Sequence, residues 1–317
     1  MKLALRSSAV VLAILLPAAV AIGQDQPEFI GWVDRGDGGE AWLASKAELQ
    51  ALGEQFDTSL ELYEYFKEQA EGGDTLTWED MAKPEYDWSG IFTRTGGGLS
   101  FDPDIPADQT TAKLTPEGEA ARQEKIDLIA TVGGEYDPIS DCRPPGFPRW
   151  LTEPFLHEYI VTPDQTWAIN EMVNDVRRIY TDGRDHTAPE DAYATWNGDT
   201  IGFWDDGMLI THTTYLMNGQ YQRGIQPNYS DQVEVVERWK KIDGVTLQSD
   251  VWVFDPVNLA EPWYTRQSWT ELANDDHFLR IRYWWCGENQ NNAITQTPDG
   301  NSTFTDFTFD SSATVAE

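Results

Sequence analysis

Three titratable side chains stand in strand-like segments at positions where apolar residues are expected. Successive side chains of a strand point to opposite faces, so a polar residue in phase with apolar neighbours points towards the apolar side. The residues placed in this way are Glu237 with Val235 and Trp239, His212 with Met208 and Ile210, and Glu171 with Trp167 and Ile169. A carboxylate and a histidine that face one cavity could act as general base and general acid. We therefore take Glu237, His212 and Glu171 as candidate catalytic residues.

A structural interpretation competes with the catalytic one. A buried carboxylate is strongly destabilising unless it is paired. The arginines that could pair with Glu237 are Arg177, Arg178, Arg280 and Arg282. A one-residue bulge at 235–236 would instead turn Glu237 outwards. Of the other histidines, His157 is interpreted as a core residue, whereas His186 and His277 stand in loops and are expected on the surface.

Aromatic side chains are abundant, with 14 tryptophans in the chain. Trp284 and Trp285 are adjacent, so they point to opposite faces of a strand, and one such residue is exposed or lines the mouth of a cavity. Aromatic rings stack on sugars and on flat apolar ligands, although core packing and cross-strand contacts also account for them. The candidate ligand-binding tryptophans are Trp167, Trp196, Trp204 and Trp239.

The sequence contains no established catalytic or metal-binding motif. It has no His-Glu-x-x-His, no paired Cys-x-x-Cys and no calcium-binding loop. It also lacks a Gly-x-Ser-x-Gly nucleophile motif. The triple glycine at 96–98 is not placed between a strand and a helix, as a phosphate-binding loop would be. We therefore predict no metal and no cofactor.

Alternating segments with short turns dominate the second half of the chain. The expected strands are 155–161, 165–172, 176–180, 201–204, 208–214, 232–242, 245–254, 264–270 and 278–286. Asp243-Gly244 is the strongest hairpin signal among the turns. Such a series of hairpins predicts a mainly β fold, either an antiparallel up-and-down barrel or a two-sheet sandwich.

The first half is expected to form helices and loops. One helix is predicted over 44–53, and a second begins at Thr58, where Glu61 completes a capping box. A third begins after Thr115, with Pro116 at its first position, and reaches about 130. We divide the chain into a signal peptide (1–23), a helical and irregular extension packed on the β domain (24–140), the antiparallel β domain (141–292) and a polar, partly disordered tail (293–317).

The N-terminus has the pattern of a cleavable signal peptide. Lys2 and Arg6 precede an apolar run over 9–20 and small residues up to Gly23. We therefore expect a periplasmic or secreted protein, and no later segment is long enough for a membrane span. The chain has 54 acidic and 22 basic residues and a net charge of −32, which argues against nucleic acid as a partner. Nothing in the sequence indicates the oligomeric state.

Cys142 and Cys286 are the two cysteines of the chain. An even number of cysteines in an exported protein favours a disulfide, and two buried thiols are the alternative. The disulfide would connect the start of the β domain to its last predicted strand.

Four sequence motifs carry a resemblance to a protein family. They are 142–148 (CRPPGFP), 174–183 (NDVRRIYTDG), 195–198 (TWNG) and 235–238 (VVER). Over about 86–292 the chain resembles a family of exported bacterial proteins that has no assigned activity and is similar to lipocalin-like β-barrels. The resemblance implies a barrel with a small, often apolar ligand. The resemblance also implies a polar site, because relatives carry histidine at the positions of Asp199, Tyr229 and Gly287, and aspartate at the position of His212.

Three functions remain open on this reasoning. The first is an exported binding protein for a small hydrophobic or aromatic molecule, held in a tryptophan-lined cavity with His212 and Glu237 as orienting groups and with Asp199 and Tyr229 among its ligand-binding residues. The second is a lyase, hydratase or hydrolase that uses a carboxylate–histidine pair inside the barrel. The third is a structural envelope protein with a filled interior, in which Glu237 pairs with an arginine.

Overall fold

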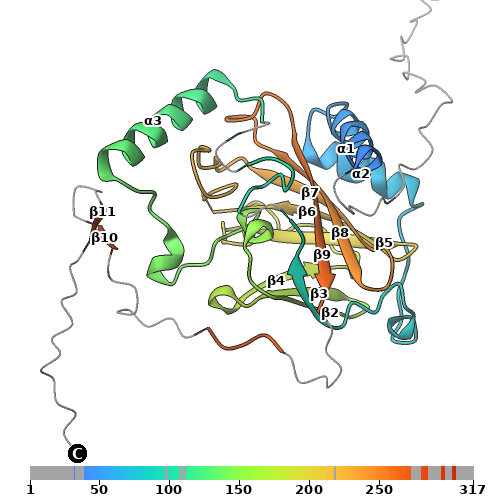
Figure 1. The fold of residues 1–317 in the computed structure, drawn as a ribbon. Coiled ribbons are helices and arrows are strands. Elements are labelled where there is room, and N and C mark those ends of the chain that lie inside the picture. The colour runs from blue at the N-terminus through green and yellow to red at the C-terminus, as the bar shows by residue number, and fades with distance from the viewer. Residues whose placement is uncertain are drawn as a thin grey trace, which may run out of the picture. The chain divides into compact units, whose positions relative to one another are not determined.

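Strands β1 to β9 form a closed barrel in which neighbours follow chain order, as seen in the computed structural model (Figure 1). The structure describes residues 32, 39–96, 99–106, 109, 112–217, 219–272, 280–284, 294–296 and 302–304. The barrel strands are β1 (Ile91–Arg94), β2 (His157–Val161), β3 (Gln165–Asn170), β4 (Asp175–Tyr180), β5 (Asp199–Asp205), β6 (Met208–Thr214), β7 (Glu234–Lys241), β8 (Thr246–Phe254) and β9 (Trp263–Glu271). Strands β10 (Ile294–Gln296) and β11 (Ser302–Phe304) form a separate hairpin. The predicted mainly β barrel is confirmed.

One strand pairing departs from the predicted antiparallel order. Strands β4 and β5 are parallel, with Tyr180 opposite Ile201, whereas the other barrel pairs are antiparallel. Two consecutive parallel strands need a connection that returns along the length of the first. Residues 181–198 make this connection, and they become important for the site described below.

Strand β1 closes the barrel by pairing with both β2 and β9. No strand is predicted here from the sequence, because only five residues lie between Gly90 and the glycines that begin at Gly96. Conversely, a strand was predicted over 278–286, but residues 280–284 form none. The other positions of that prediction lie outside the described residues.

Helices α1 (Glu40–Gly53), α2 (Ser59–Gln69) and α3 (Pro116–Val132) agree with the predicted helical regions. The capping box is present, since Thr58 and Glu61 each accept a hydrogen bond from the other's backbone N–H. Thr115 caps α3 and Pro116 is its first residue, as expected. The short 3-10 helices are η1 (Asp80–Ala82), η2 (Pro138–Asp141), η3 (Arg149–Thr152) and η4 (Met172–Asn174).

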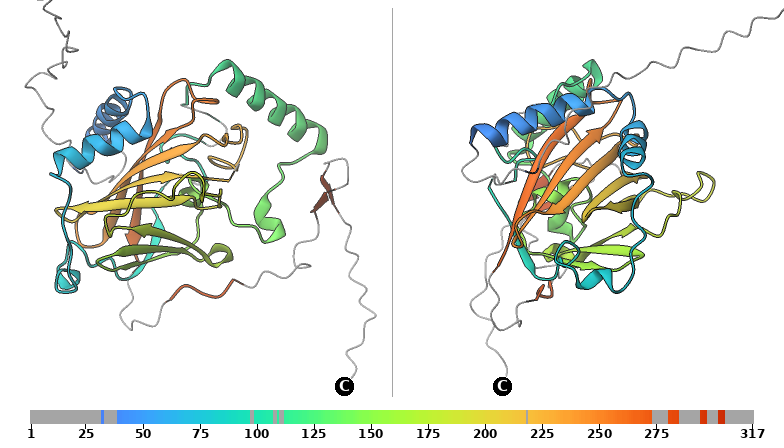
Figure 2. Two further views of the ribbon diagram at one scale, coloured as in Figure 1. Left: turned by 180° about the vertical axis from the view of Figure 1, so that it is seen from behind. Right: turned by 90° about the vertical axis from the view of Figure 1, so that its right-hand side faces the viewer.

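Helices α1 and α2 pack on the outside of the barrel wall (blue in Figure 2). Helix α1 contacts β9, and α2 contacts β6, β7 and β8. The indole of Trp252 on β8 donates to the carbonyl of Leu49 at 2.9 Å. At Gly53 the helix approaches so closely that a Cβ atom would lie 2.4 Å from Trp252 Cδ1. The outer face of these strands is therefore buried as well as the inner face.

Aromatic side chains fill the barrel interior. Trp239 and Trp269 stack with ring centroids 4.9 Å apart, and Trp88 packs against Trp204 at 5.1 Å. His157 lies among them, fully buried, and its Nε2 atom is 3.0 Å from the amide of Asn170. The predicted core role of His157 is confirmed by this environment.

Several sequence predictions lie outside the described residues. They are the signal peptide over 1–23, Cys286, His277, and most of the polar tail. Cys142 follows η2 with a positive φ of 61° and is not a free thiol, but the disulfide with Cys286 stays a prediction. Within the described residues, no helix combines the length and the apolar character needed to cross a bilayer.

Candidate functional site

The predicted base Glu237 points into the barrel interior, where it is fully paired. Its carboxylate accepts hydrogen bonds from both terminal nitrogens of Arg177, from Thr211 Oγ1 at 2.8 Å and from Trp239 Nε1 at 3.1 Å. Arg177 in turn lies 3.8 Å from the ring centre of Phe147. Both charges are buried, so this arrangement matches the structural ion pair considered for Glu237.

His212 lies on the opposite face of the same wall, which corrects the expectation that it shares a cavity with Glu237. In the β6–β7 register, Thr211 is opposite Glu237, whereas His212 is opposite Val236. Alternation therefore directs His212 outwards, where Tyr63 of α2 stacks on its ring at 5.5 Å. The third candidate, Glu171, also lies away from both, at the start of η4, and accepts from Arg282 at 2.7 Å.

The predicted ligand-binding residues do not form one group. Trp204 and Trp239 are buried in the barrel core. Trp167 is half-buried beneath the guanidinium of Arg178, and Trp196 is half-buried in the loop before β5. Tyr229 is buried, and within the described residues its hydroxyl has no hydrogen-bond partner. Two of them contact a predicted catalytic residue within the described part of the chain: Trp239 donates to Glu237, and Asp199 reaches His212 through His186.

A chain of polar contacts runs through His212 on the outer face of the barrel. Ser59 Oγ lies 2.9 Å from His212 Nε2, and His212 Nδ1 lies 2.9 Å from His186 Nε2. His186 Nδ1 is 3.4 Å from the Asp199 carboxylate. At the other end, the Ser59 hydroxyl donates to Glu234, whose carboxylate is 3.6 Å from His212 Nε2. We call these five residues the His212 chain.

Strand β6 carries His212, and four further elements complete the His212 chain. Ser59 is the first residue of α2, and the Thr58 cap fixes the direction of that helix. Asp199 and Glu234 begin β5 and β7. His186 lies in the 181–198 connection. Because β4 and β5 are parallel, this connection returns along the outer wall of the barrel. The His186 side chain is 18% exposed, so His186 is half-buried, less exposed than expected for a histidine in a surface loop.

Ser59, His186 and Glu234 were not predicted as site residues. Ser59 lies at the predicted start of the second helix, and alternation along 232–242 places Glu234 on the face opposite to that of Glu237. Neither position reveals a contact with His212, which lies 153 residues from Ser59 along the chain. The capping box at Thr58 was the one available signal, because it fixes where the first turn of α2 begins.

Burial and neighbouring charges set the protonation of the His212 chain. Burial lowers the pKa of His186, and the adjacent His212 lowers it further, against the opposing effect of Asp199. Burial raises the pKa of Glu234, but hydrogen bonds with His212 and Ser59 outweigh it and leave this pKa below its ordinary value. Burial, together with Glu64 and Asp185, holds the pKa of the Tyr63 hydroxyl well above its ordinary range. Glu234 is therefore ionised at neutral pH.

Neutral histidines allow two directions of hydrogen bonding along the chain. In one, His186 donates to His212, His212 donates to Ser59, and Ser59 donates to Glu234. In the other, Ser59 donates to His212, His212 donates to His186, and His186 donates to Asp199. The second direction removes the hydroxyl proton from the Ser59–Glu234 contact. It is therefore favoured when the Glu234 side chain, which is 39% exposed, moves away from Ser59.

A cleft of 1260 Å³ opens beside the His212 chain, and Ser59, His186, His212 and Glu234 line it. Its apolar lining consists of Phe56, Leu60, Val233, Phe254, Leu259 and neighbouring Pro and Ala residues. Among the described residues, none that lines the cleft is a lysine or an arginine. The cleft is thus apolar on one side, and its charged groups are acidic.

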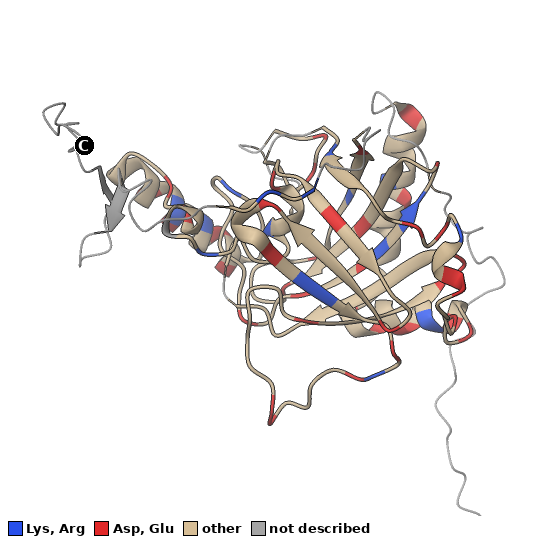
Figure 3. Cartoon of the chain, turned by 90° about the horizontal axis from the view of Figure 1, so that it is seen from below, with Lys and Arg blue, Asp and Glu red and all other residues tan. Residues whose placement is uncertain are grey.

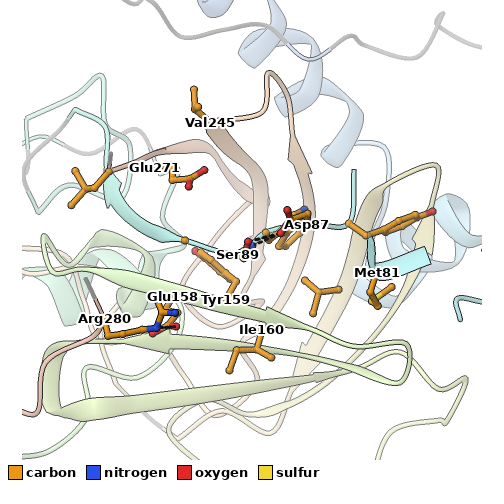
Figure 4. A pocket seen from close by; sticks show the side chains of 14 residues that line it. Met81, Asp87, Ser89, Glu158, Tyr159, Ile160, Val245, Glu271 and Arg280 are labelled. Carbon is orange, nitrogen blue, oxygen red and sulfur yellow. Dashed lines mark hydrogen bonds and ion pairs between the residues drawn. The ribbon is translucent and has the colours of Figure 1, made fainter. Parts of the chain in front are cut away.

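A second cleft, of 580 Å³, lies beside β1, β2 and the end of β9 (Figure 4). Among its charged side chains, Glu158 pairs with Arg280 at 4.0 Å and Glu271 pairs with Lys241 at 3.4 Å. No histidine is among the described residues that line it. It offers fewer groups for chemistry than the cleft at the His212 chain.

The distribution of charged residues and of possible metal ligands describes the site further. Acidic positions are distributed over helices, strands and loops, with fewer basic positions between them (Figure 3). Within the described ranges, no three or more His, Cys, Asp and Glu side chains are grouped so that they could hold a metal ion. The His212 chain presents hydroxyl, imidazole and carboxylate groups at the cleft.

Comparison with known proteins adds no argument to the fold described above. No family model and no curated protein matches the chain. Among solved structures, it is similar to a secretary abundant heat soluble (SAHS) protein from Ramazzottius varieornatus, with 12% identity and a TM-score of 0.29. The likeness covers 58% of this chain and 95% of that one. The barrel assignment rests on the strand pairing described above.

Proposed function

We propose that the protein binds a small molecule with an apolar or aromatic body in the cleft between α2 and the outer barrel wall. The observation that carries this proposal is the cleft itself, which combines an apolar lining with the His212 chain. Small-molecule sites generally join a mostly apolar concave surface to a few fixed polar groups. Ser59, His212 and Glu234 supply such groups, and the helix and strands that hold them are rigid elements.

The barrel interior has a different role in this proposal. Its tryptophans stack on one another, and Glu237 is paired with Arg177. Both features are those expected of a structural barrel with a filled interior. We therefore place the ligand outside the barrel and regard the interior as the scaffold that holds β6 and β7 in position. Export through the N-terminal signal peptide is retained as part of the proposal.

Binding of N-phenyl-1-naphthylamine tests the site directly. This probe is uncharged and fluoresces more strongly in apolar surroundings. Leu60 lines the cleft and is 49% exposed, so Leu60→Asp leaves the core intact and places a charge in the first turn of α2, where acidic residues are favourable. We expect affinity to fall about tenfold or more, since a buried leucine contributes about 1.5–3 kcal/mol.

Leu128→Asp is the matched control, because Leu128 is 51% exposed on α3 and does not line the cleft. This variant should bind the probe as the wild type does. Equal binding by the wild type and Leu60→Asp would place the ligand elsewhere and refute the proposed site.

A further inference from the structure

Ser59 has surroundings that its structural role does not require. Thr58, not Ser59, caps α2, so the Ser59 hydroxyl is free of that task. This hydroxyl instead lies 2.9 Å from His212 Nε2 and is almost fully buried at the cleft. A serine hydroxyl within hydrogen-bond distance of an imidazole, which is itself oriented by a third group, is the arrangement of an activated nucleophile.

The remainder of the His212 chain orients the imidazole. His186 Nε2 lies 2.9 Å from His212 Nδ1, and Asp199 also accepts a backbone hydrogen bond from Thr187 at 2.7 Å. Asp199 is thereby held in place beside His186. In the direction of hydrogen bonding that ends at Asp199, His212 Nε2 is unprotonated and faces the Ser59 hydroxyl. His186 and Asp199 are positioning residues in this arrangement.

The first turn of α2 supplies donors for a developing negative charge. The first N–H groups of a helix have no partner within the helix. Glu61 N–H bonds to the Thr58 side chain and Leu62 N–H bonds to the Thr58 carbonyl. Within the described residues, the N–H groups of Ser59 and Leu60 are left without an acceptor. Two such groups beside a serine, at the positive end of a helix, can stabilise an oxyanion.

From this geometry we propose that Ser59 is the nucleophile of an acyl-transfer site that hydrolyses uncharged carboxylic esters. The proposal rests on the proposed function, because the ester would bind in the same cleft. Ser59 Oγ would form a bond to the ester carbonyl carbon while its proton passes to His212 Nε2. Collapse of the tetrahedral intermediate breaks the bond to the alkoxy oxygen, which takes that proton and leaves as the alcohol. Water then attacks the acyl-serine, releases the carboxylic acid and returns the proton to Ser59.

The charge and shape of the cleft define the substrate class. Asp57, Asp231 and Glu234 line it, and among the described lining residues no lysine or arginine balances them. An anionic substrate is therefore disfavoured. Phe56, Leu60 and Phe254 provide a surface for an apolar acyl or alkoxy group. The substrate class is thus a neutral ester with at least one apolar side.

Glu234 controls access to Ser59. Its carboxylate accepts a hydrogen bond from the Ser59 hydroxyl and so occupies the space beside that hydroxyl. The Glu234 side chain itself is 39% exposed. A bound ester that displaces this carboxylate would release Ser59 to donate to His212. The displaced carboxylate would remain near the imidazole, where it can stabilise the imidazolium formed during attack.

The test uses the full-length mature protein, an ethoxy fluorophosphonate probe and 4-nitrophenyl butyrate. The probe phosphonylates activated serines, and peptide mass mapping locates the label without any variant. We expect the label on Ser59 and a burst of 4-nitrophenolate close to one equivalent per chain. Ser59→Ala should abolish both. Ser89→Ala changes an exposed serine that bonds to Asp87, and this variant should change neither the labelling nor the burst.

Variants of the His212 chain separate chemistry from structure. His212→Gln should slow labelling by about 10²-fold or more, and Asp199→Asn should shift the pH profile of hydrolysis while KM changes little. Binding of N-phenyl-1-naphthylamine, measured in parallel, should persist in Ser59→Ala. A label on another residue, no label at all, or an unchanged burst in Ser59→Ala would overturn the nucleophile. If the naphthylamine still bound, only the nucleophile would fail, and the proposed binding function would stand.

Discussion

The Nε2 atom of His186 lies 2.9 Å from the Nδ1 atom of His212, and this contact joins a loop to the outer face of the barrel. It exists because β4 and β5 are parallel, with Tyr180 opposite Ile201. A tight hairpin at this point would have left His186 away from the wall. The connection over 181–198 instead returns along it, and the polar chain from Asp199 to Glu234 is completed.

The ion pair between Arg177 and Glu237 makes a prediction about stability. Both groups are buried in the barrel interior, so Glu237→Gln leaves the Arg177 cation without its counter-ion. Removing one partner of a buried pair lowers the free energy of unfolding by about 3–5 kcal/mol. Urea denaturation measures this. Arg177→Gln should behave alike, whereas Arg178→Gln, on the exposed face, should cost less than about 1 kcal/mol. Similar costs for the two arginines would contradict the interior ion pair.

The burial of His157 leads to a prediction of how the free energy of unfolding changes with pH. Burial, with a smaller effect of Arg94, lowers the pKa of His157 to about 3, whereas the unfolded chain titrates near 6.5. Between these values the unfolded state binds one more proton, so stability rises with pH and falls on acidification. From pH 7 to pH 5 the loss from this residue is about 2 kcal/mol. Unfolding curves of His157→Gln should lack that part of the pH dependence, and an unchanged slope would show that His157 is not buried in the neutral form.

The lowered pKa of Glu234 leads to a prediction of how this carboxylate contributes to the free energy of unfolding at different pH values. Its pKa is lowered in the folded state, because the hydrogen bonds with His212 and Ser59 outweigh burial. Such a carboxylate stabilises the fold above its unfolded pKa, and that contribution is lost as pH falls through the folded value. Glu234→Gln should therefore be destabilising at pH 7, and this penalty should shrink as the pH falls below the ordinary glutamate value of 4.5. Glu64→Gln, at an exposed position of α2, is the control. A penalty for Glu234→Gln that persists unchanged in acid would argue against an ionised Glu234.

The close approach of α1 to the barrel at Gly53 leads to a prediction about substitutions at this position. Alanine normally stabilises a helix, but here its Cβ would lie 2.4 Å from Trp252 Cδ1. We expect Gly53→Ala to lower the free energy of unfolding by about 1–3 kcal/mol. Gly134→Ala meets nothing within 4 Å and should be neutral or slightly stabilising. Differential scanning calorimetry compares the two variants, and equal melting temperatures would mean that α1 does not dock on Trp252.

Much of the fold could be predicted from local sequence signals. Turn residues account for the hairpins, as at Asp206 and Gly207, whose positive φ angles of 46° and 71° suit the tight β5–β6 turn. The helix starts at Thr58 and Thr115 follow from their caps. Strand β1 was missed because four residues carry too little alternation to stand out. Its pairing with β9 is a long-range contact, which local patterns do not encode.

The site was harder to predict, for a physical reason. Alternation shows which residues share a face but not which face is inside, and β6 is buried on both faces. Met208 and Ile210 lie on the outer face, and they are apolar because helices and loops cover that face. The position of His212 on the same face as these two residues therefore did not place it in the interior. For Glu237 the apolar neighbours were truly interior ones. The contacts of His212 with Ser59 and His186 depend on tertiary packing and on a crossover that has no local signal.

We propose that the ligand site lies on the outer wall, at Ser59 and His212, and not inside the barrel. A crystal structure of the protein with bound N-phenyl-1-naphthylamine distinguishes these two places. We expect the naphthyl ring to lie against Leu60 and Phe254, in the cleft beside His212. Probe density among Trp88, Trp204 and Trp239, or in the cleft beside Glu158 and Arg280, would contradict it.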